Sequence, residues 1–402
     1  ADSNAVTLAV PPVTAIVTNT NDAGVGSLRQ AILDTNNGGI CPSTSTINFN
    51  IPGPGPHVIS PASDLPTIDC PTLIDGYSQP GATPNTLPNG VSGSNAVIKI
   101  RIDGAGAMLS GNGLTLIAGS AGAIVRGLSI GGFASGPGIH VGSGADSVSV
   151  LGNFIGVAPD GTAAGNGNGV EVFSEAVQIG ASAPAARNIV ACNSGDGIEI
   201  SGSADVYNNE IGTRPDGATA CGNSGGVNFK SASGGSVGGP GAGNFIRNNL
   251  GDGIFLDSTD FILVSNNIIN SNSNNGITFG TRSDCAGAGN TFRGNSIGTN
   301  GALGILLQAF GSRGVNDPLD TDGGGCGSDG NRGQNYPVID LVTYRPDKTL
   351  VDFTLSSEAS KTYDIEVFSN ITADTPNHGR GETSRATTTV STDAMGSVSV
   401  TN

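Results

Sequence analysis

The sequence has 402 residues, of which 36% are hydrophobic, 12% are charged and 65 are glycine. This composition argues against a large helical protein and against an α/β fold with a layered core. The net charge of −16 makes the surface acidic, which excludes nucleic acid as a partner because few cations are available for phosphates. Tryptophan is absent, which counts against glycan sites built on large aromatic platforms.

The location of the protein is indicated by its cysteines and by its hydropathy. No apolar run reaches the roughly 18 residues of a membrane span, so no such span is predicted. The six cysteines lack the paired spacing of a zinc site, and their even number suits an oxidising compartment. The first residues, Ala1 to Ser3, contain no basic or apolar export segment. We therefore expect a secreted protein whose export signal has been removed.

The amino-terminal segment begins with a helix signal. Ser27 and Gln30 have the spacing of a capping box, and apolar residues follow on one helical face. Irregular strands are expected at 46–51, 72–77 and 97–102. The helix is predicted to cap the open end of the β structure that follows, because an exposed first strand would be a bare edge.

Two motifs then repeat with one offset. The segment IGVAPDG at 155–161 recurs as IGTRPDG at 211–217, and GDGI at 195–198 recurs at 251–254, so both pairs lie 56 residues apart. A β-sandwich would not produce a fixed offset of this kind. A shared offset in independent motifs is typical of a stacked repeat.

A shorter repeat lies within this period. Glycine is followed by an apolar, a variable and an apolar residue at intervals of 23 to 31 residues, with variable positions at His140, Glu171, Glu199, Asn228, Phe255, Thr278 and Leu306. Three short strands with Gly/Asn turns fit into each interval, as a coiled parallel solenoid requires. Turn asparagines, including Asn153, Asn209, Asn267 and Asn295, are expected to form side-chain ladders. The predicted fold is an all-β, right-handed parallel β-helix over residues 1–311.

The repeat stops after residue 311. Residues 312–335 are rich in Gly and Asp and are expected to form a linker. Residues 336–402 contain alternating segments at 350–355 and 362–368, which predict a small β-sandwich-like module at the far end of the column.

A family resemblance supports this fold. The segment VTNTNDAGVGSLRQAILDTN at 17–36 and the segment IDGYSQPGA at 74–82 resemble secreted bacterial right-handed parallel β-helix proteins with a CSLREA-type amino-terminal segment, which are similar to pectate lyases in their solenoid. Gly26 stands where that motif has Cys, and Gln30 where it has Glu. The resemblance implies extracellular or cell-surface placement in a bacterium, and it bears on fold and location far more than on any reaction.

The variable positions of the repeat are the candidate site. In an apolar-x-apolar strand of a packed column the middle residue points to solvent, so successive rungs should stack His140, Glu171, Glu199 and Asn228 in one row. Two residues further on, the strands offer Phe173, Lys230 and Asp257, and Phe255 borders the patch. The catalytic candidates are Glu171, Glu199, Asp257 and Lys230. The candidates for substrate binding are His140, Asn228, Phe173 and Phe255.

Two reactions are compatible with these residues. Glu171 and Glu199 in adjacent rungs would form a carboxylate pair with a proton donor and an ionised partner, at a spacing closer to that of retaining than of inverting glycosidases. In a lyase, Lys230 or His140 would instead remove a proton beside a uronate carboxylate. The acidic net charge disfavours a polyanionic substrate, which favours hydrolysis or transfer. Ordinary solvated side chains on an exposed sheet are the alternative interpretation.

Other acidic motifs are assigned to structure or to a cation. Asp196 and Asp252 in the GDGI repeats are interpreted as turn residues, as are Asp160 and Asp216 in the PDG loops. The candidate cofactor is Ca²⁺, because closely spaced carboxylates on a Gly-rich loop suit a hard cation. Its candidate ligands are Asp317, Asp320 and Asp322.

The cysteine positions predict disulfides. Cys192 and Cys221 each lie five residues before a repeat glycine, so they should occupy one place in consecutive rungs and form a bridge. Cys41 with Cys70 and Cys285 with Cys326 would complete three pairs, although the four remaining cysteines permit three connectivities.

Two functions remain open at this stage. The first is a secreted carbohydrate-active enzyme, a glycoside hydrolase, transferase or polysaccharide lyase, whose partner is a polysaccharide or cell-surface glycan along the outer sheet. The second is a non-catalytic surface or adhesive spacer. Loops 156–168 and 212–225 should wall a groove over Glu171 and Glu199 in an enzyme, whereas a flat sheet would favour the spacer.

Overall fold

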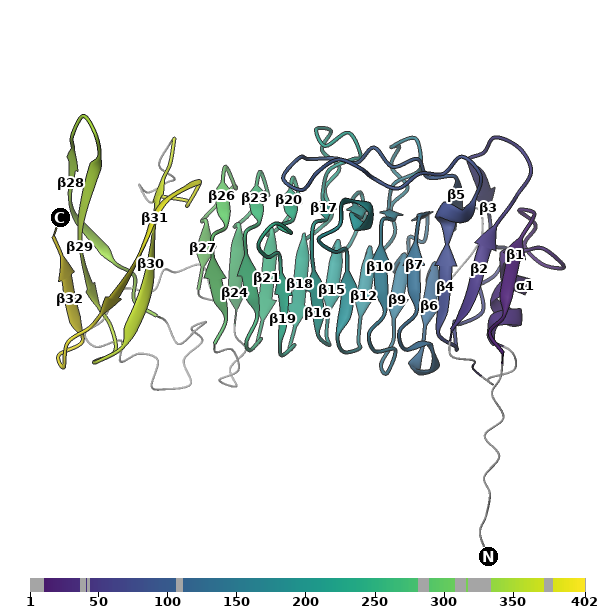
Figure 1. The fold of residues 1–402 in the computed structure, drawn as a ribbon, viewed down its shortest axis with the longest axis horizontal. Helices are drawn as coiled ribbons and strands as arrows, with labels where there is room; N and C mark the ends of the chain where they lie inside the picture. The colour runs from purple at the N-terminus through teal and green to yellow at the C-terminus, as the bar shows by residue number, and fades with distance from the viewer. Residues whose placement is uncertain are drawn as a thin grey trace, which may run out of the picture.

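The computed structural model describes residues 11–36, 41, 44–105, 111–280, 289–307, 316, 334–371 and 379–401. The chain forms a column of parallel strands that ends in a small antiparallel module (Figure 1). Three sheets run along the column, and each successive rung adds one strand to each sheet. The parallel β-helix, its amino-terminal helix and the carboxy-terminal β module predicted from the sequence are confirmed.

The strands of the column fall into three sheets, named here sheets A, B and C. Sheet A has ten strands: β1 (Thr14–Val17), β2 (Ser45–Phe49), β4 (Thr72–Asp75), β7 (Ile124–Arg126), β10 (Ser149–Leu151), β13 (Val177–Ile179), β16 (Ala204–Val206), β19 (Gly235–Val237), β22 (Leu263–Ser265) and β25 (Thr291–Arg293). Sheet B has nine: β3 (His57–Ile59), β5 (Ile100–Asp103), β8 (Leu128–Gly131), β11 (Phe154–Ile155), β14 (Ile189–Val190), β17 (Glu210–Ile211), β20 (Phe245–Arg247), β23 (Ile268–Asn270) and β26 (Ser296–Gly298). Sheet C has eight: β6 (Leu114–Leu116), β9 (Ile139–Val141), β12 (Val170–Val172), β15 (Ile198–Ile200), β18 (Val227–Lys230), β21 (Ile254–Asp257), β24 (Ile277–Gly280) and β27 (Ile305–Leu306).

The core is a narrow file of aliphatic side chains. In sheet C, Val170 is in register with Ile198, which is in register with Val227, and all three are buried. Each strand contributes only its inward residues, so a long column needs little total hydrophobicity. This arrangement explains how a chain with 36% hydrophobic residues builds a continuous core.

Two buried asparagine ladders run along the column. In each, the side-chain amide donates to the Oδ1 of the asparagine in the next rung at 2.8 to 3.3 Å. The first ladder consists of Asn153, Asn188, Asn209, Asn244, Asn267 and Asn295, and the second of Asn166, Asn193, Asn223, Asn249, Asn272 and Asn300. The predicted ladder is confirmed, and the second was not predicted.

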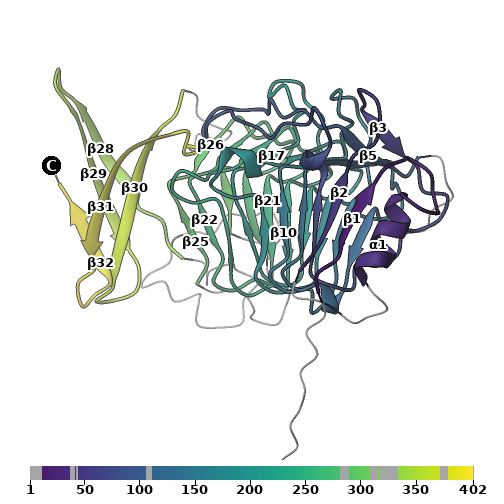
Figure 2. The same ribbon diagram turned by 45° about the vertical axis from the view of Figure 1, so that its right-hand side comes forward.

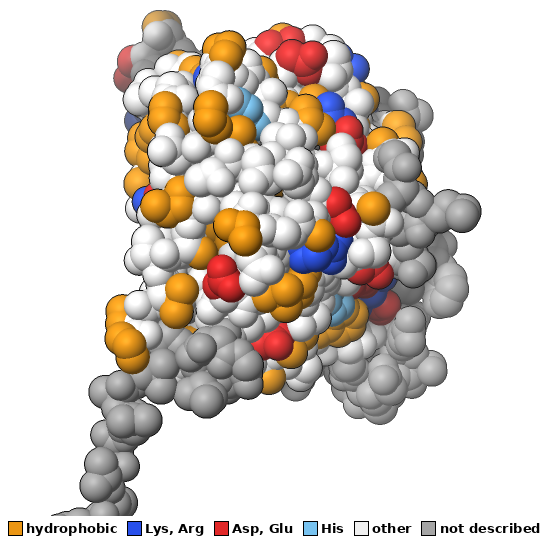
Figure 3. Space-filling model, turned by 90° about the vertical axis from the view of Figure 1, so that its right-hand side faces the viewer, with side chains coloured by type: hydrophobic (Ala, Val, Ile, Leu, Met, Phe, Trp, Pro, Cys, Tyr) orange, Lys and Arg blue, Asp and Glu red, His pale blue; other side chains and the backbone are white. Residues whose placement is uncertain are grey.

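Both ends of the column are covered. Helix α1 (Leu28–Asn36) buries Leu28 and Ile32 against β1 and β2, and the Ser27 hydroxyl accepts from the Gln30 backbone N–H at 3.2 Å, as the capping box predicts. Figure 3 shows the amino-terminal end of the molecule, where apolar and acidic side chains are scattered among neutral polar ones. At the far end the backbone N–H of Ile297 donates to the Gly381 carbonyl at 2.9 Å.

The carboxy-terminal module consists of two antiparallel sheets. One contains β28 (Val338–Tyr344), β29 (Thr349–Ser356) and β32 (Ser397–Val400), and the other contains β30 (Thr362–Ser369) and β31 (Thr383–Ser391). Figures 1 and 2 both draw the two-stranded sheet nearer the column. The domain boundaries at 311 and 335 stay predictions, because most of this stretch lies outside the described residues.

Two disulfides are formed among the described residues. Cys192 joins Cys221 and Cys41 joins Cys70, with Cα–Cα distances of 4.8 and 5.1 Å. Both predicted bridges are confirmed, and they indicate an oxidising environment. The proposed partners Cys285 and Cys326 lie outside the described residues. A search of the described chain finds no helix with the length and hydropathy of a membrane span.

Residues 79–98, here called the arm, leave the column after β4 and return at β5. In Figure 1 the arm follows the upper edge of the column, alongside strands that come much later in the sequence. Asn89 at the far reach of the arm donates to the Ser182 carbonyl at 2.6 Å and to the Gly241 carbonyl at 2.5 Å. At the base of the arm Ile98 is buried against Phe154 and Ile189. The arm therefore covers part of the outer face of sheet B.

Candidate functional site

The predicted row of middle residues forms on the outer face of sheet C. Glu171 on β12 is in register with His140 on β9 and with Glu199 on β15, and Glu199 is in register with Asn228 on β18. Phe255 on β21 continues the row. Their flanking residues are buried in the column, and this alternation turns the middle side chains outward.

The two glutamates are paired with different cations. Glu171 Oε2 lies 2.7 Å from His140 Nδ1, and Glu199 Oε2 lies 2.7 Å from Lys230 Nζ. The Asn168 side-chain amide also donates to Glu199 Oε2 at 3.2 Å. The carboxylates therefore point along the column in opposite directions, one toward the preceding rung and one toward the following rung.

The side chains of this cluster are partly accessible. The Glu171 and His140 side chains are 20% and 23% exposed, and those of Glu199 and Lys230 are 12% and 44% exposed. Each carboxylate is thus shielded from bulk water without being sealed from it. Ion pairs in such surroundings interact more strongly than fully solvated ones.

Aromatic rings border the cluster, as predicted. The Phe173 ring lies 5.5 Å from the His140 ring, centroid to centroid, and is tilted by 45°. Phe173 is 42% exposed, whereas Phe255 is half-buried. Asp257 is in register with Lys230 on the neighbouring strand, so the third carboxylate candidate lies beside Lys230, two residues further along the strands than the row of middle residues.

A second polar column, not predicted as part of the site, lies beside this row. It consists of polar turn residues three positions before the middle residues, Asn168, Asp196, Asp252 and Asn275, and Gly225 interrupts it in the rung of Asn228. The Asn228 amide donates to Asp196 Oδ2 at 2.7 Å, so this turn residue bonds a middle residue of the next rung. The turn residue Asn168 likewise bonds a middle residue of the next rung, because its amide donates to Glu199. Asp196 is therefore both a turn residue and a neighbour of the candidate site. The constant three-residue spacing in each rung is the sequence signal that identifies this column.

Asp252 in this column has a perturbed carboxyl group. Burial raises its pKa, while hydrogen bonds from the Asn275 backbone N–H at 2.9 Å and from the Asn275 amide at 3.1 Å oppose the increase. The equivalent rungs carry neutral Asn168 and Asn275. An ionised carboxylate at this position therefore carries a desolvation cost that an amide does not.

We expect Asp252→Asn to be more stable than the wild type near pH 7. A raised native pKa stabilises the fold below the unfolded value of 3.8, and this contribution is lost as the pH rises through the native pKa. Urea unfolding near pH 7 should give a higher free energy of unfolding for Asp252→Asn than for the wild type, and this difference should vanish near pH 3. Asp216→Asn is the control with opposite sign, because hydrogen bonds from Thr219 and Ala218 lower the pKa of Asp216. Equal effects of the two substitutions would contradict the assignment.

The two loops named as possible groove walls are held in part by the arm. In loop 212–225, the Pro215 carbonyl accepts from the Ser94 backbone N–H of the arm at 2.8 Å, and the Gly217 carbonyl accepts from the Ser92 hydroxyl at 2.9 Å. In loop 156–168, Val157 packs with Ile98 at the base of the arm. Parts of both loops therefore pack against the arm on the sheet B side, whereas the end of loop 156–168 returns to sheet C, where Asn168 contacts Glu199.

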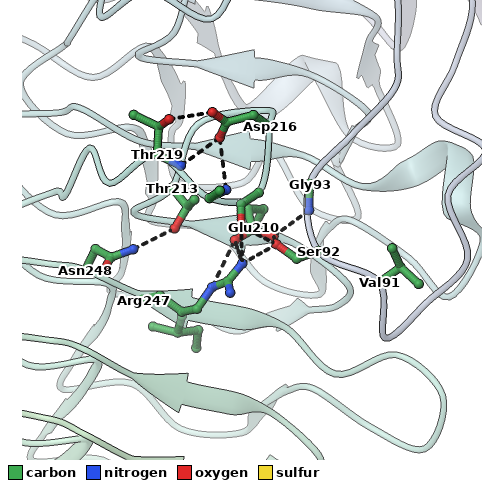
Figure 4. A network of polar contacts seen from close by, with 12 residues as sticks. Val91, Ser92, Gly93, Glu210, Thr213, Asp216, Thr219, Arg247 and Asn248 are labelled. Carbon is green, nitrogen blue, oxygen red and sulfur yellow. Dashed lines mark hydrogen bonds and ion pairs between the residues drawn. The ribbon is translucent and has the colours of Figure 1, made fainter.

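A second charged network holds the arm and is buried (Figure 4). Glu210 is fully buried; its Oε1 pairs with Arg247, and its Oε2 accepts from the Gly93 backbone N–H at 2.9 Å. Arg187, also buried, donates to the carbonyls of Val91 at 2.6 Å and Gly93 at 2.7 Å. Such a closed network serves structure, because every charge in it is satisfied within the protein.

The remaining acidic motifs give no site among the described residues. Asp160 and Asp216 stabilise the tight PDG turns, since Asp160 Oδ1 accepts from the Thr162 backbone N–H at 2.9 Å and Asp216 Oδ1 from that of Thr219 at 2.8 Å. The calcium candidates Asp317, Asp320 and Asp322 lie outside the described residues. Within the part of the chain that the structure describes, no group of three or more His, Cys, Asp or Glu side chains could hold a metal ion.

Comparison with known proteins gives similarity at the level of the fold. No protein-family model and no curated protein matches the chain. The enzymatically active domain of bacteriophage CBA120 tailspike protein 2 is similar with a TM-score of 0.39 and 10% identity over 89% of this chain, which spans 62% of that domain's length. The A-module of the Azotobacter vinelandii mannuronan C-5 epimerase AlgE4 gives a TM-score of 0.33 and 12% identity, covering 74% of this chain and 98% of that module. The Dettilon tailspike protein gives a TM-score of 0.33 and 12% identity, covering 96% and 90%.

Proposed function

We propose that the outer face of sheet C between β9 and β24 binds an extended polysaccharide and cleaves it. The observation that carries this proposal is the pair of adjacent, half-shielded ion pairs, His140 with Glu171 and Glu199 with Lys230. Rungs about 4.8 Å apart present these groups at a spacing close to the length of one sugar unit in an extended chain. A glycan along the column would therefore meet one new set of side chains per sugar.

Hydrolysis or transfer is the favoured reaction. Glu171 and Glu199 stand on neighbouring strands about 4.8 Å apart, and because their carboxylates point away from each other, the gap between the carboxyl groups is wider than the strand spacing and opens toward the separation that inverting glycosidases use. One carboxyl group would protonate the leaving oxygen while the other acts as nucleophile or base. Lys230, Asn228 and His140 would orient hydroxyl groups, and Phe173 and Phe255 would provide apolar contact for sugar rings. Asp257 is a second candidate base.

Elimination is the second reaction that these residues could support. Glu171 binds His140 through Nδ1, so Nε2 remains as the atom that would accept a proton from the substrate. Lys230 would be the other candidate base in such a lyase. The net charge of −16 opposes the approach of a polyuronate, and this favours hydrolysis or transfer on a less charged glycan. The oxidising environment indicated by the disulfides supports action on glycans outside a bacterial cell.

The test is a screen of polysaccharides for new reducing ends and for ultraviolet-absorbing unsaturated products. Glu171→Gln and Glu199→Gln should each lower the turnover of an active substrate by about 10²- to 10⁴-fold, because each removes a proton-transfer group. Glu175→Gln, at an exposed position outside the row, is the matched control and should leave turnover unchanged. Activity that survives both substitutions in the row would rule out the proposed pair.

A non-catalytic spacer or adhesin is the second candidate function. The observation that favours it is that parts of loops 156–168 and 212–225 are held by the arm, so those parts do not wall the face of sheet C. In this case the rigid column would present the carboxy-terminal module or a glycan-binding face at a distance. Glycan binding without any product, abolished by Lys230→Ala or Phe173→Ala, would support this function over the enzyme.

A further inference from the structure

The edge strand β28 of the carboxy-terminal module is unusually apolar and exposed. Apolar and aromatic residues along and just before it are between 37% and 82% exposed: Tyr336, Val338, Ile339, Leu341, Val342 and Tyr344. Among the described strands, β28 pairs only with β29, so its other edge has no strand partner in the described part of the chain. Figures 1 and 2 both place β28 in the sheet farther from the column.

The exposure has a structural cause on the inner face of the module. Ile339 lies opposite Phe353 and Val342 opposite Val351, so both side chains face the same side as the small core. That core contains Phe353, Leu355 and Val390 as its fully buried apolar residues in the described part of the module. The facing sheet has only two strands, β30 and β31. The three-stranded sheet therefore extends past the sheet that covers it.

An edge of this kind is normally protected. Proteins blunt exposed edges with several charges, proline or very short strands, because an open apolar edge recruits another strand. β28 has seven residues and one charged side chain, Asp340. Its length and composition therefore fit strand addition by another chain.

We propose that β28 pairs with β28 of a second copy of this protein, antiparallel about a two-fold axis. With Thr343 opposite itself, Val342 would lie opposite Tyr344 and Leu341 opposite Arg345 of the partner subunit. The Thr354 hydroxyl of β29 donates to Asp340 Oδ2 at 2.8 Å, which puts Asp340 on the outer face with Leu341 at the bulge of β28, and its other carboxylate oxygen would face the same Arg345. Because of the two-fold axis, the dimer would contain this ion pair twice. This local complementarity favours a second copy over an unrelated strand, although each chain carries a net charge of −16.

The pairing would join two columns through their carboxy-terminal modules. The glycan-binding faces proposed above would then be present in two copies per particle, and a long or surface-bound glycan would be held by both. The dimer itself does not depend on the proposed function, because it uses residues more than one hundred positions from Glu171 and Glu199.

The test is sedimentation velocity of the full chain over a range of concentrations. A discrete dimer is expected. Asp340→Arg and Arg345→Asp should each raise the dimer dissociation constant by more than about tenfold, because each places like charges side by side twice. The double variant carrying both substitutions should restore the wild-type constant. Glu358→Arg makes the same change in charge at an exposed position away from β28 and should have no effect.

The outcomes separate clearly. Restoration by the double variant supports the pairing, and it also shows that the single variants were folded well enough to be rescued. A monomer at all concentrations would overturn the proposal. So would open-ended polymers, or a dimer that is indifferent to the charges at positions 340 and 345.

Discussion

Replacing Glu210 by alanine is expected to lower the free energy of unfolding by about 3–5 kcal/mol, the usual cost of removing one partner from a buried ion pair. The substitution leaves Arg247 without its carboxylate and leaves the Gly93 backbone N–H without an acceptor. Both groups lie where water cannot fully replace the lost contact, because Glu210 is fully buried and the Arg247 side chain is only 18% exposed. The loss should fall mainly on the arm.

Hydrogen exchange and limited proteolysis would locate this effect. The Gly93 amide, together with the Ser94 amide bonded to Pro215, should exchange much faster in Glu210→Ala, and residues 79–98 should become the first site of cleavage. Glu210→Gln keeps an acceptor without the charge, so its arm amides should exchange at rates between those of Glu210→Ala and the wild type. Glu175→Ala removes an exposed glutamate and should change stability by no more than about 0.5 kcal/mol. Unchanged protection of the arm would show that its other contacts suffice to hold it.

Much of the fold and part of the site follow from the repeat. The glycine followed by an apolar-x-apolar triplet marks one strand per rung, and superposing the triplets puts Glu171 beside Glu199 and Cys192 beside Cys221. This inference works because a solenoid converts a sequence interval into a fixed spatial step. Residues that share a place in the repeat therefore become neighbours whatever their side chains are.

Features outside the repeat could not be obtained in this way. The arm has no periodic pattern, and its hydrogen bonds span up to 155 residues, from Ser92 to Arg247. Its contacts hold parts of loops 156–168 and 212–225 on the sheet B side, and no pattern in the sequence indicates this. The pairing of Lys230 with Glu199 was also not predicted, because it runs diagonally between rungs and depends on the rotamer of a long side chain.

The second asparagine ladder shows a different limit. Its members from Asn166 to Asn300 are separated by 23 to 30 residues, because the loop that precedes each strand of sheet C varies in length. Their positions are constant in space and irregular in sequence. The distance from a ladder asparagine to the repeat glycine varies as well: it is three residues from Asn166 to Gly169 and four from Asn193 to Gly197. This distance therefore does not reveal the register of the ladder from the sequence.

The ladders should be the most sensitive polar elements of the column. Asn244 makes four side-chain hydrogen bonds: its amide donates to the Val206 carbonyl at 2.8 Å and to Asn267 Oδ1 at 2.9 Å, and its Oδ1 accepts from the backbone N–H and the amide of Asn209 at 2.9 and 3.0 Å. Asn244→Ala leaves these buried groups unpaired. We expect it to lower the free energy of unfolding by about 3–5 kcal/mol, since each buried unsatisfied group costs about 1–3 kcal/mol and the costs are not fully additive.

Two further variants would show that the ladder, rather than lost packing, accounts for this cost. Asn244→Asp keeps the shape but replaces both donor hydrogens by acceptor oxygen facing Val206 and Asn267, so it should be at least as destabilising as alanine near neutral pH. Asn295 ends its ladder, and among the described residues its amide donates to the Val264 carbonyl alone, at 2.8 Å, so Asn295→Ala should cost less than Asn244→Ala. Denaturant unfolding followed by circular dichroism would rank the three variants against exposed Asn21→Ala. If Asn244→Asp proved as stable as the wild type, donation along the ladder would contribute nothing to the column, and the asparagines would be needed there only for their backbone conformation and size.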